Sequence, residues 1–215
     1  MIIHAYDEDY LAGAQNVLGH AVDFAVMTLN IDPDKFGDAF VVSSISKQFA
    51  NGNPKYVAGM NGCEIARFVL DDVNIAYGEK EDVMYLDKSP EYWSGWALAY
   101  YQWYSGRSFT EILSAVNLSK IIAMYSPYHE MDIMQFVDKM NEIMLEAYPM
   151  VRLRARREAC GYSQSQLARE SEVPLRQIQM FEQRQRDINK TAAATLLRLS
   201  RTLHCRMEDL MELNS

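Results

Sequence analysis

The sequence predicts an all-α protein in which a larger helical domain precedes a smaller domain of five helices. Three observations support this prediction. Apolar residues recur at helical spacing along most of the 215 residues, capping sequences precede several of these runs, and clusters of Pro, Gly and Asn separate them. We place the domains at residues 1–148 and 151–213, with Pro149 at the hinge. This length suits one medium and one small domain.

The first domain contains a series of apolar stripes that predict helices. The first stripe runs from Leu11 to Leu29 and ends at Asp32-Pro33. Two more cover about residues 36–50 and 62–77, with Asn51-Gly52-Asn53-Pro54 between them. Later helices are expected to begin at Ser89-Pro90, at a Ser108/Glu111 capping box, at Asn117 and at Ile133. Short strands are compatible with residues 1–5 and 83–86.

The second domain begins with a basic helix, Val151 to Cys160, which Gly161 ends as a left-handed cap. A short helix then opens at Ser163, where Gln166 completes a Ser-x-x-Gln capping box. Glu172-Val173-Pro174 ends that helix, because the residue before a proline avoids the α region.

Another helix follows Pro174 and buries Ile178 and Phe181 at helical spacing, which leaves Arg and Gln side chains for its outer face. Two short helices that cross over a tight turn fit the major groove of DNA. Beyond them, Asn189 is expected to cap a helix that holds Leu196 and Leu203, and a last turn or two spans 207–213.

Charge is distributed unequally between the two domains. The whole chain has a net charge of −8, which by itself argues against nucleic acid. Residues 151–215, however, hold 12 Lys and Arg against 8 Asp and Glu, a net charge of +4. Residues 1–150 hold 9 basic and 21 acidic groups, a net charge of −12. Phosphates would therefore bind at the basic end, with an affinity that falls as salt rises.

The carboxy-terminal pattern resembles the Cro/C1-type (XRE) helix-turn-helix domains of phage repressors and bacterial regulators. The resemblance covers about 63 of the 215 residues and rests on the following positions: Leu153-Arg154, Ser163-Gln164, Leu167-Ala168, Val173, Ile178, Glu182, Thr195-Leu196-Leu197, Leu203 and Asp209-Leu210. It implies a DNA-binding domain. Glu172 and Arg184 stand where the family usually has glycine, and the loop from Glu182 to Thr195 is longer than usual.

The expected DNA contacts fall into two groups. The phosphate contacts are assigned to Gln164, Arg184 and Arg186. The base contacts are assigned to the outer face of the second helix of the motif, residues Leu175, Arg176, Gln177, Gln179 and Met180. Arg176 suits guanine, the two glutamines suit adenine or the backbone, and Leu175 or Met180 suits a thymine methyl group.

Four further side chains of the second domain are also interpreted. Glu182 is expected to orient its neighbours rather than to touch DNA. For Arg152, Arg154 and Arg157, simple solvation of their helix is weighed against a role in binding.

An aromatic segment in the first domain has two interpretations. Trp93, Trp96, Tyr100, Trp103 and Tyr104 share one broad helical face. The first interpretation makes this face the core of the domain, and the second makes it a site for a ligand or a protein partner. The region also resembles, more loosely, the amino-terminal regions of Firmicutes helix-turn-helix proteins found beside toxin-like genes. That likeness rests on GNPKYVAGMNG, PEYWSGWALAYYQWYSGRSF and MYSPYHEMD, and it implies an antitoxin or autorepressor role.

The sequence therefore predicts a DNA-binding transcriptional regulator that acts as a homodimer on operator DNA. The alternatives are a protein-interaction module that neutralises a partner toxin and a ligand-sensing regulator. No phosphate loop, nucleophile elbow or metal-ligand spacing occurs, so we expect no enzyme activity, no cofactor and no metal. Cys63, Cys160 and Cys205 are interpreted as core thiols. With no leader and no long apolar run, a cytoplasmic protein without membrane contact is expected.

Overall fold

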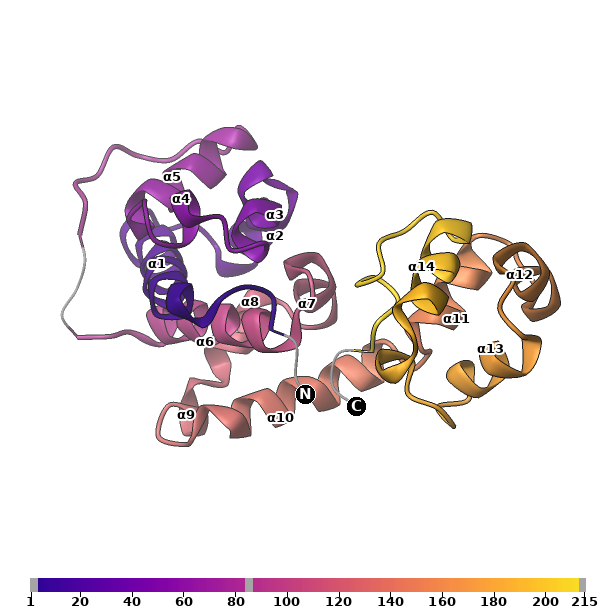
Figure 1. Cartoon of the computed structure of the whole chain (residues 1–215). Helices are drawn as coiled ribbons and strands as arrows, with labels where there is room; N and C mark the ends of the chain where they lie inside the picture. The colour runs from indigo at the N-terminus through magenta and orange to yellow at the C-terminus, as the bar shows by residue number, and fades with distance from the viewer. Residues whose placement is uncertain (1–3, 84–86, 213–215) are drawn as a thin grey trace. The chain divides into compact units, whose positions relative to one another are not determined.

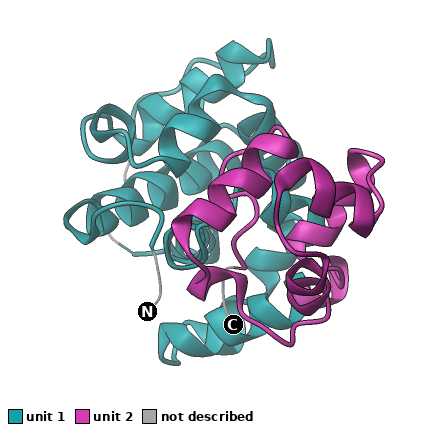
Figure 2. Cartoon of the chain, turned by 45° about the vertical axis from the view of Figure 1, so that its right-hand side comes forward, with its two compact units in different colours: residues 1–144 teal, residues 145–215 magenta. Residues whose placement is uncertain are grey.

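The computed structural model describes residues 4–83 and 87–212, and all of the regular structure in these ranges is helical. The all-α prediction is therefore confirmed for the described residues. Residues 1–3 and 84–86 of the two expected short strands lie outside these ranges, and the neighbouring His4, Ala5 and Val83 are not in strands. The chain divides into two compact units, residues 1–144 and 145–215 (Figure 2).

Two long helices form the centre of the amino-terminal unit. α1 (Leu11–Asp23) packs against α6 (Pro90–Ser105) in the most extensive helix pairing of the described chain (Figure 1). Gly95 lets the two backbones meet, because a Cβ atom at this position would lie 2.4 Å from the carbonyl oxygen of Leu18. α1 continues into a π-helical segment, η2 (Phe24–Thr28). The pairing buries one face of α6 and leaves another to carry its larger aromatic side chains.

The unit contains nine further helical elements in its described residues. They are η1 (Glu8–Tyr10), α2 (Pro33–Val42), α3 (Ser44–Ala50), α4 (Pro54–Val57), α5 (Gly62–Asp72), α7 (Phe109–Ala115), α8 (Leu118–Ala123), α9 (Tyr125–Tyr128) and α10 (Ile133–Ala147). The predicted starts are confirmed at Ser89-Pro90 and at the Ser108/Glu111 capping box. Asp32-Pro33, predicted as the end of the first stripe, also begins α2, because the Asp32 side chain accepts from the N–H of Lys35. α10 buries Phe136, Val137, Met140 and Met144 along one stripe.

Two predicted runs end differently in the structure. The run at 36–50 divides at Ser43, whose extended backbone (ψ 154°) separates α2 from α3. The run at 62–77 ends earlier, since α5 stops at Asp72 and Asn74 adopts a positive φ of 57°. Within the described ranges, no helix has the length and apolar character needed to cross a membrane.

The carboxy-terminal unit contains α11 (Arg152–Ala159), α12 (Gln164–Ser171), α13 (Leu175–Glu182), η3 (Ile188–Lys190) and α14 (Ala193–Thr202). Gly161 takes the predicted left-handed conformation, with φ 74°. A separate apolar core holds these helices together: Leu153, Leu167, Val173, Ile178, Phe181, Ile188, Leu196, Leu199, Leu203 and Leu210.

One prediction for the end of this unit is wrong. Asn189 does not cap α14, whose N-cap residue is Ala192. Instead, the Asn189 side chain accepts a hydrogen bond from the backbone N–H of Glu212 at 2.9 Å and lies within η3. The last turn predicted for 207–213 is present at residues 208–210, where the N–H of Leu210 donates to the carbonyl of Met207 at 3.1 Å. The asparagine therefore anchors the end of the described chain rather than a helix start.

Candidate nucleic-acid interface

The turn between α12 and α13 follows from local capping interactions. The Ser163 hydroxyl accepts from the N–H of Gln166 at 3.2 Å, and the Gln166 side chain accepts from the N–H of Ser163 at 2.8 Å. This confirms the predicted capping box. α12 ends at Glu172, which takes the left-handed conformation (φ 54°, ψ 28°) despite its side chain. Pro174 then serves as the N-cap residue of α13.

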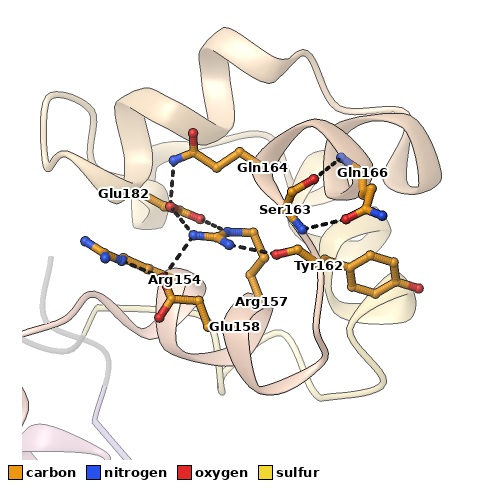
Figure 3. Close-up of polar contacts among 8 residues, drawn as sticks. All are labelled: Arg154, Arg157, Glu158, Tyr162, Ser163, Gln164, Gln166 and Glu182. Carbon is orange, nitrogen blue, oxygen red and sulfur yellow. Dashed lines mark hydrogen bonds and ion pairs between the residues drawn. The ribbon is translucent and has the colours of Figure 1, made fainter.

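A buried ion pair joins α11 to α13. Arg157 donates to the Glu182 carboxylate through Nε (2.6 Å) and Nη2 (2.9 Å), and its Nη1 donates to the carbonyl of Tyr162 at 2.7 Å (Figure 3). The two side chains are only 9% and 3% exposed. The hydrogen bonds to Glu182 raise the pKa of the Arg157 guanidinium, against the opposing effect of burial. Such a bidentate pair fixes both distance and orientation.

Gln164 completes this arrangement at the start of α12. Its amide nitrogen donates to Glu182 Oε2 at 2.8 Å, so one carboxylate binds both α11 and α12 (Figure 3). The prediction that Glu182 orients its neighbours is confirmed. The solvation interpretation of Arg157 is wrong, because this side chain is buried and paired. The sequence could have indicated this burial, because Arg157 follows the buried Leu153 by four residues and so lies on the same helical face.

The two faces of α13 differ as the helical spacing predicts. Ile178 and Phe181 are buried in the core of the unit. On the opposite side, Leu175 is 37% exposed and Arg176 is exposed. Within residues 4–83 and 87–212, the Arg176 guanidinium has no ion-pair or hydrogen-bond partner. The pair of Glu182 with Arg157 fixes α13 to α11. The Arg176 guanidinium has no such partner and is therefore free to contact a ligand.

The other expected base-contact residues are less exposed. Gln179 and Met180 are half-buried on the flanks of α13. Gln177 is also half-buried, and its amide nitrogen donates to the Thr191 hydroxyl at 3.2 Å. Gln177 can still offer its carbonyl oxygen and a second N–H. Its contact with Thr191, which the sequence did not indicate, also fixes the rotamer of the side chain.

The loop after α13 carries two exposed arginines, Arg184 and Arg186. Arg184 adopts a positive φ of 55°. The backbone N–H groups of Gln185 and Arg186 both return to the carbonyl of Met180, at 2.9 and 3.2 Å. The extended loop predicted here is therefore a compact turn followed by η3, and Ile188 anchors it in the core. Among the described residues, neither guanidinium lies within 4.0 Å of a carboxylate oxygen.

Comparison with protein families gives one match. Residues 153–210 match the family model described as helix-turn-helix. The carboxy-terminal region is a Cro/C1-type helix-turn-helix domain. A domain of this family supports a DNA-binding regulator in general, and the family is not typically enzymatic. No curated protein and no protein of solved structure is measurably similar to the chain.

Two other arginines of the helix-turn-helix domain have partners inside it. Arg154 Nε pairs with Glu158 at 2.8 Å on the solvent side of α11 (Figure 3). Arg152 is half-buried, and its backbone N–H donates to the Glu212 carboxylate at 2.6 Å. These contacts favour a structural role for both residues within the domain.

The aromatic face of α6 separates into a buried and a half-exposed part. Trp103 is 4% exposed, its Nε1 donates to the carbonyl of Tyr6 at 2.8 Å, and the His4 ring stacks on it at 3.7 Å. The recognition interpretation is therefore wrong for Trp103, which is a core residue. Trp93 is half-buried and packs edge-on against Phe136 at 5.3 Å.

The half-exposed part is a row of three rings at four-residue spacing. Trp96, Tyr100 and Tyr104 stack with centroid separations of 6.4 and 6.3 Å and interplanar angles of 13°. Burial raises the pKa of the Tyr100 hydroxyl, and Tyr104 and the carboxylates of Asp132 and Glu8 act in the same direction. We call these three rings the aromatic row. It combines apolar surface with nearby negative charge.

Proposed function

We propose that the chain is a sequence-specific transcriptional regulator whose α13 contacts base edges in the major groove of an operator. The observation that carries this proposal is that Arg176 is exposed and unpaired, on a helix that the Arg157–Glu182 pair fixes to α11. Arginine makes bidentate contacts to guanine O6 and N7. Such contacts need a helix of defined orientation, which the buried pair supplies.

Phosphate contacts are proposed for three groups around α13. Arg184 and Arg186 extend from the loop that follows it, and Gln164 stands at the amino-terminus of α12. Free N–H groups at a helix start favour anions. The amide of Gln164 is already bound to Glu182, so its proposed contact uses the remaining N–H. Together these groups would hold the motif on the backbone while α13 reaches the bases.

Arg176→Ala tests the base contact. We expect a loss of roughly 1–3 kcal/mol in binding to a duplex selected from a random library, with little change on scrambled DNA. The matched control is Arg206→Ala, which removes an exposed arginine outside α12 and α13. Gel-shift titrations measure both. An equal loss on selected and scrambled duplexes would show that Arg176 contacts only the backbone.

Arg186→Ala tests the phosphate contact. Because this cation is expected to neutralise one phosphate, its loss should weaken binding to every sequence and lower the slope of log K against log salt by about one. Titrations at four or more salt concentrations give that slope. An unchanged slope in the variant rules out the assignment.

Homodimer formation is proposed because helix-turn-helix domains usually bind paired half-sites. Sedimentation equilibrium at micromolar concentration, with and without the selected duplex, is expected to give a mass of twice 24.7 kDa for the protein component in at least the bound state. A monomer under both conditions contradicts the proposal. The regulatory role proposed for this dimer is repression of its own operon, measurable with a reporter fused to the upstream region.

A second candidate function is capture of a basic partner protein, such as a toxin, by the amino-terminal unit. Its support is the aromatic row together with the net charge of −12 over residues 1–150. Stacked aromatic faces beside carboxylates suit Lys and Arg side chains. Co-purification with the product of the adjacent gene should be lost in Tyr100→Ala. If the Tyr100→Ala variant still co-purifies fully with the partner, the aromatic row is not the binding site.

A further inference from the structure

The three cysteines occupy different environments. Cys63 is buried, and its thiol donates to the carbonyl of Val83 at 3.7 Å. Cys160 is exposed at the end of α11, and Cys205 is half-buried just beyond α14. The prediction of core thiols is therefore wrong for Cys160, whereas Cys205 packs against the core of its unit. Exposure, together with the charge around a thiol, decides whether it reacts.

Cys160 and Cys205 lie around a single guanidinium. The Cys160 thiol contacts the carbonyl oxygen of Leu203 at 3.6 Å. Arg156 Nε donates to the same oxygen at 3.3 Å, and its Nη2 donates to the carbonyl of His204 at 3.0 Å. Cys205 follows directly and is itself hydrogen-bonded to Arg156. Two thiols far apart in the sequence are thus brought to one place by the ends of α11 and α14.

The charges at this place act on Cys205 in both directions. Burial has the largest effect and raises the pKa of the Cys205 thiol, and Asp209 and Cys160 act in the same direction. The positive charge of Arg156 lowers this pKa but does not offset the rise. Cys160, which is exposed, is the more accessible of the two thiols, and both lie in a part of the helix-turn-helix domain that is separate from α13.

We propose that Cys160 and Cys205 form a redox modification site at which a hydroperoxide produces a reversible disulfide within the domain. The exposed Cys160 thiolate attacks the peroxide, the O–O bond breaks, and Cys160 becomes a sulfenic acid while the leaving oxygen takes a proton. The Cys205 thiolate then attacks the Cys160 sulfur. The S–S bond forms, the S–O bond breaks, and hydroxide leaves as water. Two thiols lose two electrons in total, and the peroxide gains them.

The bond would close a loop that contains α12 and α13. Since a crosslink of this kind restricts the unfolded chain, it stabilises the enclosed segment against opening. Cys160 also lies three residues before the Ser163 capping box, so the bond would restrain the entry to α12. Hydrogen exchange of amides in α12 and α13 is therefore expected to slow by more than about tenfold on oxidation.

Peroxide treatment of the reduced full chain tests the proposal. We expect a mass loss of two hydrogens, and a tryptic crosslink between the peptides 158–169 and 202–206 that a reducing agent reverses. Cys63→Ser is the matched control and should form the same crosslink. Cys205→Ser should leave Cys160 as a sulfenic acid that dimedone traps, with circular dichroism confirming that the variant is folded. A chain in which Cys160 advances to sulfinic acid without a crosslink, or links to a second chain, overturns the proposal.

Discussion

Glu182→Gln is expected to lower the free energy of unfolding of the carboxy-terminal unit by about 3–5 kcal/mol, the usual cost of removing one partner of a buried ion pair. The carboxylate accepts from two nitrogens of Arg157 and one of Gln164. A glutamine offers one acceptor oxygen in place of two. In either orientation of the amide, Arg157 would therefore lose one of its two acceptors, and the buried guanidinium would face a neutral group.

The three tryptophans, Trp93, Trp96 and Trp103, lie in the amino-terminal unit, so tryptophan fluorescence does not report on this change. Hydrogen exchange of peptides within 153–182 measures it directly. Glu158→Gln is the matched control, because Glu158 also contacts Arg157, at 3.3 Å, but lies on the surface. That variant should exchange almost as the wild type does. Equal exchange in the Glu182 variant and the wild type would show that the pair does not hold the motif together.

Trp103→Ala is expected to destabilise the amino-terminal unit by about 3–5 kcal/mol, the range for removing a large aromatic side chain from a core. The indole packs against His4 and donates to the carbonyl of Tyr6, so its loss leaves a cavity and an unpaired carbonyl. This side chain connects the start of the chain to α6. The effect should therefore appear as global unfolding of this unit.

Urea denaturation followed by the fluorescence of the remaining tryptophans measures this loss. Trp96→Ala is the matched control, since Trp96 belongs to the half-exposed aromatic row. It should cost much less stability while reducing binding of the proposed basic partner. A Trp96 variant as unstable as the Trp103 variant would mean that the row is core packing and not a binding surface.

Local chemistry determined which parts of the fold were predictable. The capping boxes at Ser163 and Ser108 and the start at Ser89-Pro90 follow from short-range hydrogen bonds, and all three are present. The break at Ser43 was not predicted, because no glycine or proline marks it. Asn189 was misassigned because its true partner, Glu212, is remote in the sequence.

The candidate site was predictable in outline only. Helical spacing separated Ile178 and Phe181 from Arg176, and the structure keeps that separation. Spacing could not show that Gln177 binds Thr191 or that Glu182 binds Arg157, because each pair joins α13 to another segment of the chain. The same limit applied to Cys160 and Cys205, which only tertiary packing brings together.

Methylation protection of guanine N7 tests the central claim most directly, since dimethyl sulfate modifies this atom in the major groove. With the wild-type chain on a selected duplex, we expect protection of at least one guanine in each half-site. With Arg176→Ala, at a concentration that saturates the duplex, that guanine should become reactive while protection elsewhere remains. Protection that is absent in the wild type, or unchanged in the variant, would contradict the assignment of α13 to the major groove.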